Sequence, residues 1–255
     1  MDSWSNKTLK QIKSELEQFQ YEKQRSIYEQ LLNDSRKTVV DYATRCLKKL
    51  DRIEQERLRL RHMWRYEEEA LKYGYKNVVG TDEVGRGPLA GPVVAAAVVL
   101  PSDFEVFGIN DSKKLSEKKR EELAKYIKEH ALAYSIQEVS AQEIDALNIL
   151  HAAELAMKKS VDALPIGDVV FIDGTNKPFV HIPYKNIIKG DSASISIAAA
   201  SIIAKVYRDH LMVEYDKIYP EYGFAQHKGY GTKEHYDALR KYGPSPIHRK
   251  SFRLN

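Results

Sequence analysis

The sequence predicts an α/β fold preceded by a helical N-terminal extension. Residues 1–74 contain no proline and are dense in Lys, Arg, Glu and Gln, which favours helix. Beyond Gly74, short β-branched runs that indicate strands alternate with segments of helical periodicity. We therefore expect two domains: a helical extension over residues 1–74, and an α/β domain over residues 75–255 that includes a helical C-terminal part.

Composition indicates a globular protein with one main domain and an appendage. The 255 residues are 43% hydrophobic and carry a net charge of +4, which permits nucleic-acid binding without requiring it. Cys46 is the only cysteine, so no intrachain disulfide can form, as is typical of a reducing cytoplasm. The polar start Met1–Trp4 predicts no signal peptide, and the apolar run Val93–Leu100 is too short to span a membrane. We expect a cytoplasmic protein without a membrane segment.

The N-terminal extension shows the apolar spacing of amphipathic helices. One short helix is indicated by Leu9, Ile12, Leu16 and Phe19, and a longer helix is predicted from about residue 38 to residue 72. The favoured interpretation is a helical hairpin that packs on the main domain or on itself. The alternative is an accessory module for nucleic acid or a protein partner, suggested by a late basic cluster of Arg57, Arg59, Arg61 and Arg65. Arginine interleaved with glutamate is more typical of a solvated face.

Two adjacent acids follow the first predicted strand of the main domain. That strand is expected over residues 76–81, and Asp82 and Glu83 come directly after it. Because neighbouring strand residues point to opposite faces, the two carboxylates are expected to have different roles. The loop Gly85-Arg86-Gly87 comes next: its glycines let backbone N–H groups approach a ligand, and its guanidinium can bind phosphate. A turn with solvated acids is the simpler alternative, which the neighbouring Gly-Arg-Gly loop makes less favourable.

Two further acids end predicted strands later in the chain. Asp173 closes the apolar run 168–173, and Asp191 follows the run 187–189. Acids at the carboxyl ends of strands lie where α/β sheets gather their functional groups. Each acid has an alternative: Asp173-Gly174 can be a simple turn, and Asp191 can cap the small-residue helix that follows it, hold a metal, or do both.

Local patterns predict the remaining elements. A strand buried on both faces is expected over residues 93–100, and an edge strand over 134–139. Ser116 is the expected N-cap of a helix over 117–130, Ser140 of a helix from 141 to about 163, and Thr232 of a helix through 242. Tyr230 lies between two glycines that leave its ring free to stack, and Lys228 is near enough to bind phosphate. A tyrosine packed on the protein surface is the alternative.

Four carboxylates at one site would need a cation. Like charges raise one another's pKa, so grouping Asp82, Glu83, Asp173 and Asp191 is costly without divalent metal. Oxygen ligands select hard cations, Mg²⁺ or Mn²⁺, and no cluster of histidine and cysteine indicates zinc. The sequence has no GxxxxGK[ST] run, which argues against a P-loop nucleotide hydrolase. Two hard cations can activate water and stabilise the leaving oxygen of a phosphodiester.

Several linked motifs resemble bacterial ribonuclease HII, of the ribonuclease H superfamily. The segment 82–87, DEVGRG, followed by PLAGP over 88–92, is similar to the signature of that family. The same likeness is shown by segment 111–116, by 189–191 leading into 198–206 and 208–209, and by the closing motif 243–252, so that it spans about residues 76–252. The resemblance implies a ribonuclease H-like mixed β-sheet flanked by helices. The helical extension is not part of the family's core pattern.

The resemblance also implies an activity. The family cleaves the RNA strand of RNA–DNA hybrids and cuts 5′ of single ribonucleotides embedded in duplex DNA by two-metal-ion catalysis, leaving a 5′-phosphate and a 3′-hydroxyl. This implies such nucleic acids as partners, a monomer, and a part in ribonucleotide excision repair and DNA replication. Carried over to this sequence, the catalytic and metal-binding residues are Asp82, Glu83, Asp173 and Asp191, and the substrate-binding residues are Gly85, Arg86, Gly87, Ser112, Lys113, Lys228 and Tyr230.

Two rival functions are kept beside this one. The first is a basic module that binds hybrids or junctions without cutting them, against which the presence of all four acids argues. The second is another carboxylate–metal nuclease of the superfamily, such as an integrase or a junction resolvase. The Gly85–Gly87 loop and the surroundings of Tyr230 argue against it. The helical extension is expected to be dispensable for the chemistry.

Overall fold

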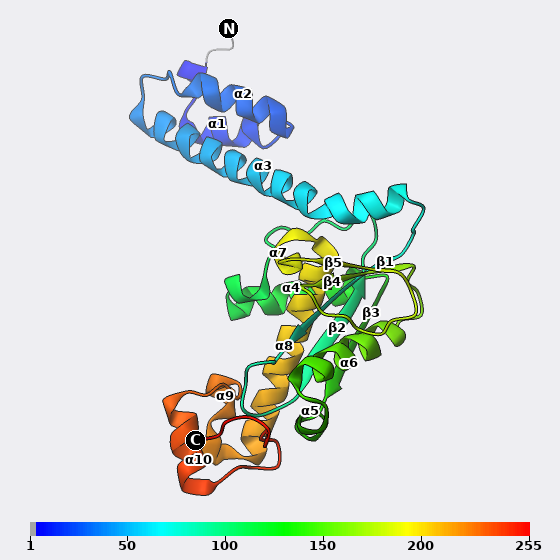
Figure 1. The fold of residues 1–255 in the computed structure, drawn as a ribbon. Coiled ribbons are helices and arrows are strands. Elements are labelled where there is room, and N and C mark those ends of the chain that lie inside the picture. The colour runs from blue at the N-terminus through cyan, green and yellow to red at the C-terminus, as the bar shows by residue number, and fades with distance from the viewer. Residues whose placement is uncertain (1–3) are drawn as a thin grey trace. The chain divides into compact units, whose positions relative to one another are not determined.

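The structure, a computed structural model, describes residues 4–255 apart from the Glu22 side chain (Figure 1). Residues 1–3, part of the polar start that predicts no signal peptide, lie outside the described residues. The chain forms two compact units that divide between Arg59 and Leu60, inside one long helix. Among residues 4–255, none of the helices combines the length and the hydrophobicity that crossing a membrane requires.

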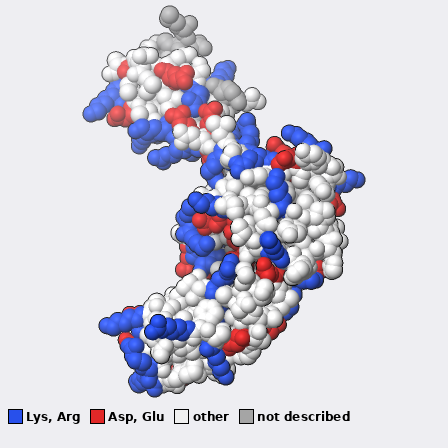
Figure 2. Space-filling model, in the orientation of Figure 1, with Lys and Arg blue, Asp and Glu red and all other residues white. Residues whose placement is uncertain are grey.

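The first unit, as far as the structure describes it, consists of α1 (Leu9–Leu16), α2 (Tyr21–Leu31) and the first part of α3 (Lys37–Lys72), after a 3₁₀ turn at Trp4–Asn6. Its helices share an apolar core around Ile12, Leu16 and Leu31. The predicted long helix is confirmed. The predicted two-helix hairpin is incomplete, because α2 adds a third helix whose apolar residues lie mostly in its second half. On the face shown in Figure 2, Lys and Arg side chains border this unit with Asp and Glu between them.

The second unit, described throughout, contains a mixed five-stranded sheet, which confirms the predicted fold class. Its strands are β1 (Val78–Val84), β2 (Val93–Val99), β3 (Ala133–Val139), β4 (Val169–Asp173) and β5 (Tyr184–Ile187), in the order β3-β2-β1-β4-β5. β2 pairs antiparallel with β1 and β3, whereas β1, β4 and β5 run parallel. The edge position predicted for residues 134–139 is confirmed. The carboxyl ends of the three parallel strands therefore lie along one side of the sheet.

Helices cover both faces of the sheet. β2 is buried along its whole length, as predicted. Val94, Ala96 and Val98 pack with α4 (Glu117–His130) and α8 (Ile195–Ile218), whereas Val93, Ala95, Ala97 and Val99 pack with α6 (Ile149–Asp162). α8 lies very close to the sheet, and a Cβ on Gly80 would come 2.1 Å from the carbonyl carbon of Ser196. Figure 1 shows α8 continuing from the sheet to α9 (Phe224–His227) and α10 (Lys233–Tyr242).

The predicted N-caps are confirmed, but one predicted helix is interrupted. The side chains of Ser116, Ser140 and Thr232 each accept a hydrogen bond from the backbone N–H three residues later. The helix expected from 141 to about 163 is instead two helices, α5 (Ala141–Leu147) and α6. Asn148 separates them with a φ of 67°, and its side chain caps α6. A positive φ is uncommon outside glycine, and here it breaks the helical path between α5 and α6.

Two boundaries near the acids also differ from the predictions. β1 continues to Val84, so Asp82 and Glu83 lie within the strand rather than after it. Asp191 lies in the short helix α7 (Gly190–Ala193), and the side chain of Ser194 caps α8. Asp191 therefore does not cap the small-residue helix, which leaves its carboxylate available for another role.

The last turns of α3 belong to the second unit. Leu60 and Met63 join the core beneath α8, and Glu67 is 2% exposed. Oε1 of Glu67 accepts hydrogen bonds from the hydroxyls of Ser194 and Ser196 and from the backbone N–H of Ser196. Among the described residues, Oε2 of Glu67 has no hydrogen-bond partner, and burial raises the pKa of the carboxyl group. The domain boundary at residue 74 stays a prediction.

Glu67 is expected to stabilise the junction of α3 and α8 through one oxygen only. Glu67→Ala leaves buried donors unpaired and should lower the free energy of unfolding by about 1–3 kcal/mol. Glu67→Gln keeps the acceptor and removes the cost of charging a buried carboxyl, so it should be at least as stable as the wild type at pH 7. A folded-state pKa above the ordinary value means that wild-type stability falls as pH rises from 4.5, so the advantage of Gln should grow with pH.

The measurement is urea unfolding followed by Trp64 fluorescence in a Trp4→Phe background, since Trp64 lies beside Glu67 and the chain has two tryptophans. Glu68→Ala, an exposed neighbour, is the control. Equal losses for the Ala and Gln variants of Glu67 would contradict the assignment.

Candidate active site

The fold brings the four predicted acids to one side of the sheet. Asp82 and Glu83 lie near the carboxyl end of β1, and Asp173 is the last residue of β4. Asp191 follows β5 on α7. The acids lie together because β1, β4 and β5 are parallel, so segments far apart in sequence end at the same place.

Burial and nearby negative charges raise the pKa of Asp82, Glu83 and Asp191. Burial raises the pKa of Asp82 well above its ordinary value, and the charges of Glu83 and Asp173 raise it further. Burial also raises the pKa of Glu83, although the nearby guanidinium of Arg86 opposes this effect from 3.2 Å. Burial and the charges of Asp111 and Asp173 raise the pKa of Asp191. The carboxylates are therefore close enough to interact electrostatically.

Backbone and amide donors hold the acids in place. Oδ1 of Asp173 accepts a hydrogen bond from the Gly190 N–H at 2.6 Å, which ties the end of β4 to the start of α7. The Asn176 amide donates to Oε2 of Glu83 at 3.3 Å, and the Ser201 hydroxyl lowers the pKa of Asp82 by hydrogen bonding. Sequence reasoning missed Asn176 and Ser201. Neither lies at a strand end, and only the packing of α8 and of the loop after β4 reveals them.

The structure separates two neighbouring residues that were both predicted to bind substrate. Ser112 is buried, and its hydroxyl lies 3.0 Å from the hydroxyl of Ser201. Burial would lower the pKa of Lys113, but the charges of the surrounding acids, among them Asp82 and Asp191, raise it. Lys113 therefore lies in the field of the carboxylates, whereas the Ser112 side chain faces the interior.

The donor set suits a hard divalent cation. The four side chains offer only carboxylate oxygens, which Mg²⁺ and Mn²⁺ prefer. The pKa values of Asp82, Glu83 and Asp191 are raised, so nearby positive charge would stabilise the ionised forms of these three groups. Within residues 4–255, no three side chains of the His, Cys, Asp and Glu types already converge on one ion position. The residues thus fit the predicted cofactor in chemistry.

Two buried arginines shape the Gly85–Gly87 loop. Arg249, near the C-terminus, donates to the carbonyls of Gly85, Arg86 and Gly91 at 2.5, 3.0 and 2.9 Å. Arg208 of α8 donates to the carbonyls of Ala90, Pro92 and Lys228. Burial lowers the pKa of both guanidinium groups, to about 10 for Arg208 and about 9 for Arg249. These bonds tie the carbonyls of the loop to the protein interior. Sequence reasoning missed both arginines.

The segment around Tyr230 lies against the same loop. A Cβ on Gly87 would come 3.6 Å from Cε1 of Tyr230, whose side chain is exposed. Gly229 accepts a hydrogen bond from the Leu89 N–H at 2.8 Å, which joins the two segments through the backbone. The Lys228 ammonium donates to the carbonyl of Ala225. Tyr230 and the Gly-Arg-Gly loop therefore form one surface.

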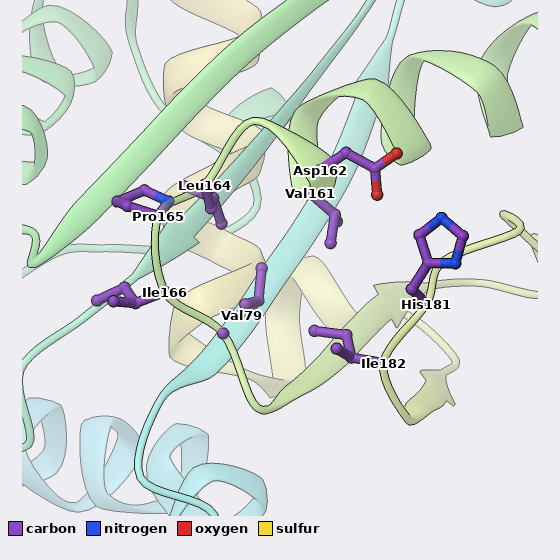
Figure 3. A pocket seen from close by; sticks show the side chains of 9 residues that line it. Val79, Val161, Asp162, Leu164, Pro165, Ile166, His181 and Ile182 are labelled. Atoms are coloured by element: carbon purple, nitrogen blue, oxygen red, sulfur yellow. The ribbon is translucent and has the colours of Figure 1, made fainter.

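A separate pocket contains none of the predicted site residues. It has a volume of about 200 Å³ and lies beside Val79, nearer the start of β1. Figure 3 shows Val161 and Ile182 among the apolar side chains that line it, with Asp162 and His181 beside them. The carboxylates instead lie at the carboxyl ends of the parallel strands. The sheet topology brings them together there, outside this pocket.

Known proteins resemble this chain over nearly its whole length. Residues 79–255 match the family described as Ribonuclease HII, and residues 8–71 match the Ribonuclease HII N-terminal domain. The chain is 51% identical over 251 residues to Ribonuclease HII of Clostridioides difficile (strain 630), covering 98% of each sequence. It is 50% identical over 246 residues to Ribonuclease HII of Bacillus licheniformis, covering 96% of each.

Solved structures share the fold of the second unit. The ribonuclease H2 from Pyrococcus horikoshii OT3 has a TM-score of 0.60 and 25% identity, covering 70% of this chain and 95% of that one. Bst-RNase HIII, whose structure is in complex with Mn²⁺, has a TM-score of 0.51 and 19% identity, covering 70% of this chain and 67% of that one. The second likeness shows the fold alone.

The mixed sheet and the acids at the ends of its parallel strands define a ribonuclease H-like nuclease. The chain belongs to the ribonuclease HII family, which confirms the resemblance drawn from its motifs. It is a ribonuclease H enzyme, an endoribonuclease that acts on RNA–DNA hybrids.

Gly85 is expected to tolerate no side chain, because two constraints meet there. Its φ is +94°, and a Cβ would lie 2.3 Å from Nε of Arg208. Gly74 has a similar φ of +91° with nothing within 4 Å, so it is a matched control. Gly74→Ala should cost about 1–2 kcal/mol of unfolding free energy through backbone strain alone. Gly85→Ala should cost about 1–3 kcal/mol more through overpacking. Urea unfolding measures both, and equal costs would rule out the proposed close packing on Arg208.

Proposed function

We propose that this enzyme also cuts DNA duplexes 5′ of a single embedded ribonucleotide, by two-metal-ion catalysis, leaving a 5′-phosphate and a 3′-hydroxyl. The observation that carries the proposal is the position of the Gly85–Gly87 loop and Tyr230. They form one surface that adjoins the carboxylates through the pairing of Arg86 with Glu83. The activity would place the enzyme in ribonucleotide excision repair and DNA replication. We also propose a monomer, as the resemblance to the family implies.

Asp82, Glu83, Asp173 and Asp191 would hold the divalent cations. When bound, Mg²⁺ or Mn²⁺ would lower the pKa of a water molecule and stabilise charge on the leaving oxygen. The chain's own groups order this site: the Gly190 N–H orients Asp173, the Asn176 amide orients Glu83, and Lys113 offsets negative charge. These contacts keep the carboxylates aligned before the substrate arrives.

The Gly85–Gly87 loop and Tyr230 would recognise the ribonucleotide. A 2′-hydroxyl both donates and accepts hydrogen bonds, so it needs polar groups held close to it. Because Arg249 binds the carbonyls of Gly85 and Arg86, the loop has a fixed backbone to present to the substrate. Tyr230 would pack on the sugar of the next nucleotide, and Arg86 would leave Glu83 to bind phosphate. Lys113 and Lys228 are proposed to bind the nucleic-acid backbone, and Ser112 is proposed to support Lys113 from its buried position.

The role of the N-terminal extension is also a proposal. A unit bordered by Lys and Arg can add phosphate contacts and so raise both affinity and its salt dependence. A truncated enzyme that lacks the extension is expected to hydrolyse its substrate only if the truncation keeps residues 60–72. Leu60, Met63 and Glu67 are buried in the second unit, so a truncation at residue 75 would expose its core.

Hydrolysis is expected to depend on divalent metal and on the acids. Asp82→Asn or Asp173→Asn should reduce cleavage of an RNA–DNA hybrid by about 10³-fold or more, because losing one ligand costs several kcal/mol of transition-state stabilisation. Binding of the hybrid, measured by fluorescence anisotropy, should change much less. Asp162→Asn, beside the separate pocket, is the control and should keep wild-type activity. Undiminished cleavage in excess chelator would disprove the metal mechanism.

Tyr230 is expected to distinguish a ribonucleotide junction from other sites. Tyr230→Ala removes stacking worth about 1–3 kcal/mol, so cleavage of a duplex with one ribonucleotide should fall about 10- to 100-fold. Tyr242→Ala is a suitable control because Tyr242 is 50% exposed, close to the 42% of Tyr230, and lies at the end of α10. Each variant is also assayed on an all-DNA duplex, which shows how much of its cleavage depends on the ribonucleotide. An unchanged rate for Tyr230→Ala would refute the junction role while leaving the hybrid nuclease intact.

A further inference from the structure

A buried cluster of histidines lies beneath Tyr230, away from the carboxylates. His235 is 0% exposed and His248 is 2% exposed. His227 stacks on His235, with 4.5 Å between ring centroids and 17° between ring planes. Phe224 packs edge-on against His235, at 89° between ring planes. The mechanism proposed above uses none of these rings, although they occupy the interior directly behind the substrate-reading segment.

The hydrogen bonds of the cluster fix where each proton lies. The backbone N–H of Ser245 can only donate, and it points to Nδ1 of His248 at 2.9 Å, so that nitrogen is the acceptor. Nε2 of His248 must then carry the proton, and it lies 2.9 Å from Nε2 of His235. Nδ1 of His235 carries the other proton and lies 2.9 Å from the carbonyl oxygen of Tyr230. The chain therefore runs from Ser245 through two imidazoles to Tyr230.

The same logic applies to His227 and the residue before Tyr230. The Gly229 N–H donates to Nδ1 of His227 at 3.2 Å, and Nε2 of His227 lies 2.7 Å from the carbonyl oxygen of Tyr222. The Tyr230 carbonyl also accepts from the Thr232 N–H at 2.8 Å, so both of its acceptor positions are used. Imidazoles thus bond the Tyr230 carbonyl and the N–H of the preceding residue, Gly229.

Burial favours the neutral forms of His235 and His248. It lowers the pKa of His235, and it lowers the pKa of His248 to about 4, with the neighbouring His235 contributing. The groups that face the pair are His227, Ser245, the carbonyl of Tyr230 and the rings of Phe224 and Tyr222. A neutral pair at pH 7 can keep the single donor and acceptor pattern that the distances require.

We propose that His235 and His248 are positioning residues that hold the Tyr230 backbone, and so set its ring beside Gly87 for reading the ribonucleotide junction. This inference rests on the proposed role of Tyr230. It explains why two buried polar rings replace apolar side chains behind an exposed tyrosine: apolar groups would fill the space but would leave the Tyr230 carbonyl with the Thr232 N–H as its one remaining hydrogen-bond donor among the described residues. The Tyr230 ring lies where a Cβ on Gly87 would come 3.6 Å from its Cε1, so a rotation of the Tyr230 backbone would move the ring relative to the loop.

The test compares His235→Leu with His235→Asn. Leucine removes the donor to Tyr230, whereas the amide nitrogen of asparagine can replace Nδ1 and keep it. Cleavage is measured on a duplex with one ribonucleotide and on an RNA–DNA hybrid, with Tyr230→Ala as reference and His210→Leu as control. His210 is a surface residue paired with Glu121, and its side chain is 64% exposed. Thermal melts set an assay temperature at which all variants are folded.

Three results support the proposal together. His235→Leu should lower kcat/KM on the single-ribonucleotide duplex about tenfold relative to the hybrid, in the same direction as Tyr230→Ala. His235→Asn should recover most of that ratio, and His210→Leu should leave it unchanged. A variant that is merely less stable would lower both substrates equally and leave the ratio at the wild-type value, which would overturn the proposal.

A second measurement does not depend on activity. Long-range ¹H–¹⁵N spectra of the wild type should show His235 protonated at Nδ1 and His248 at Nε2, and His235→Leu should shift the Gly229 and Tyr230 amide signals. The opposite tautomers would rule out the hydrogen-bond chain from Ser245 through His248 and His235 to Tyr230. If Tyr230→Ala loses the junction activity but His235→Leu does not, only the positioning role fails. If Tyr230→Ala has no effect, the proposed function of Tyr230 is wrong, and the positioning role of His235 and His248 is wrong with it.

Discussion

Repulsion between carboxylates at the ends of parallel strands is the constraint on which this structure depends. Hydrogen bonding between β1 and β4 brings Asp82 and Asp173 together, and the close approach of α8 removes water from Asp82. Each raised pKa marks a free-energy cost that an ordinary core would avoid. The protein offsets part of it with Lys113, Arg86 and backbone N–H groups. Beside this site, β2 is buried along its whole length and packs apolar side chains against helices on both faces of the sheet.

Long-range hydrogen bonds to the backbone build the surface that is proposed to read the substrate. Arg208 comes from the middle of α8 and Arg249 from the C-terminal tail, yet both donate to carbonyls within residues 85–92. A backbone carbonyl carries no net charge, so these guanidinium groups order the chain without neutralising an acid. Positive charge therefore persists beneath a loop proposed to meet phosphate. Burial, and then the neighbouring charge of Arg208, lower the pKa of Arg249 only to about 9, so its guanidinium stays charged at pH 7.

The N-terminal extension is tied to the catalytic unit by its last turns. Glu67 of α3 bonds to Ser194 and Ser196 at the start of α8, and Asp191 lies on the short helix immediately before them. The same helix thus carries the extension at one end and supports the start of α8 at the other. The division of the chain between Arg59 and Leu60 reflects this, since the last turns of α3 pack into the core beneath the sheet.

The sequence by itself determined the features that depend on near neighbours. Ser116, Ser140 and Thr232 were predicted as caps, because a cap needs only a side chain and the N–H three residues later. The doubly buried β2 was visible in its unbroken apolar run. The four acids were visible as candidates, because each follows or ends an apolar segment. Their motifs identified the family as well.

Tertiary structure decided what depends on distant partners. Ser112 and Lys113 are adjacent, and only the packing of α8 shows that one faces Ser201 and the other the acids. Arg208 looks like a surface residue of a helix until the 85–92 segment folds over it. His235 and His248 have no local signal at all, because their pairing joins residues 13 apart through a bond that exists only in the folded core. Such hydrogen bonds depend on which side chains meet in the folded core, and the spacing of residues along the sequence does not show this.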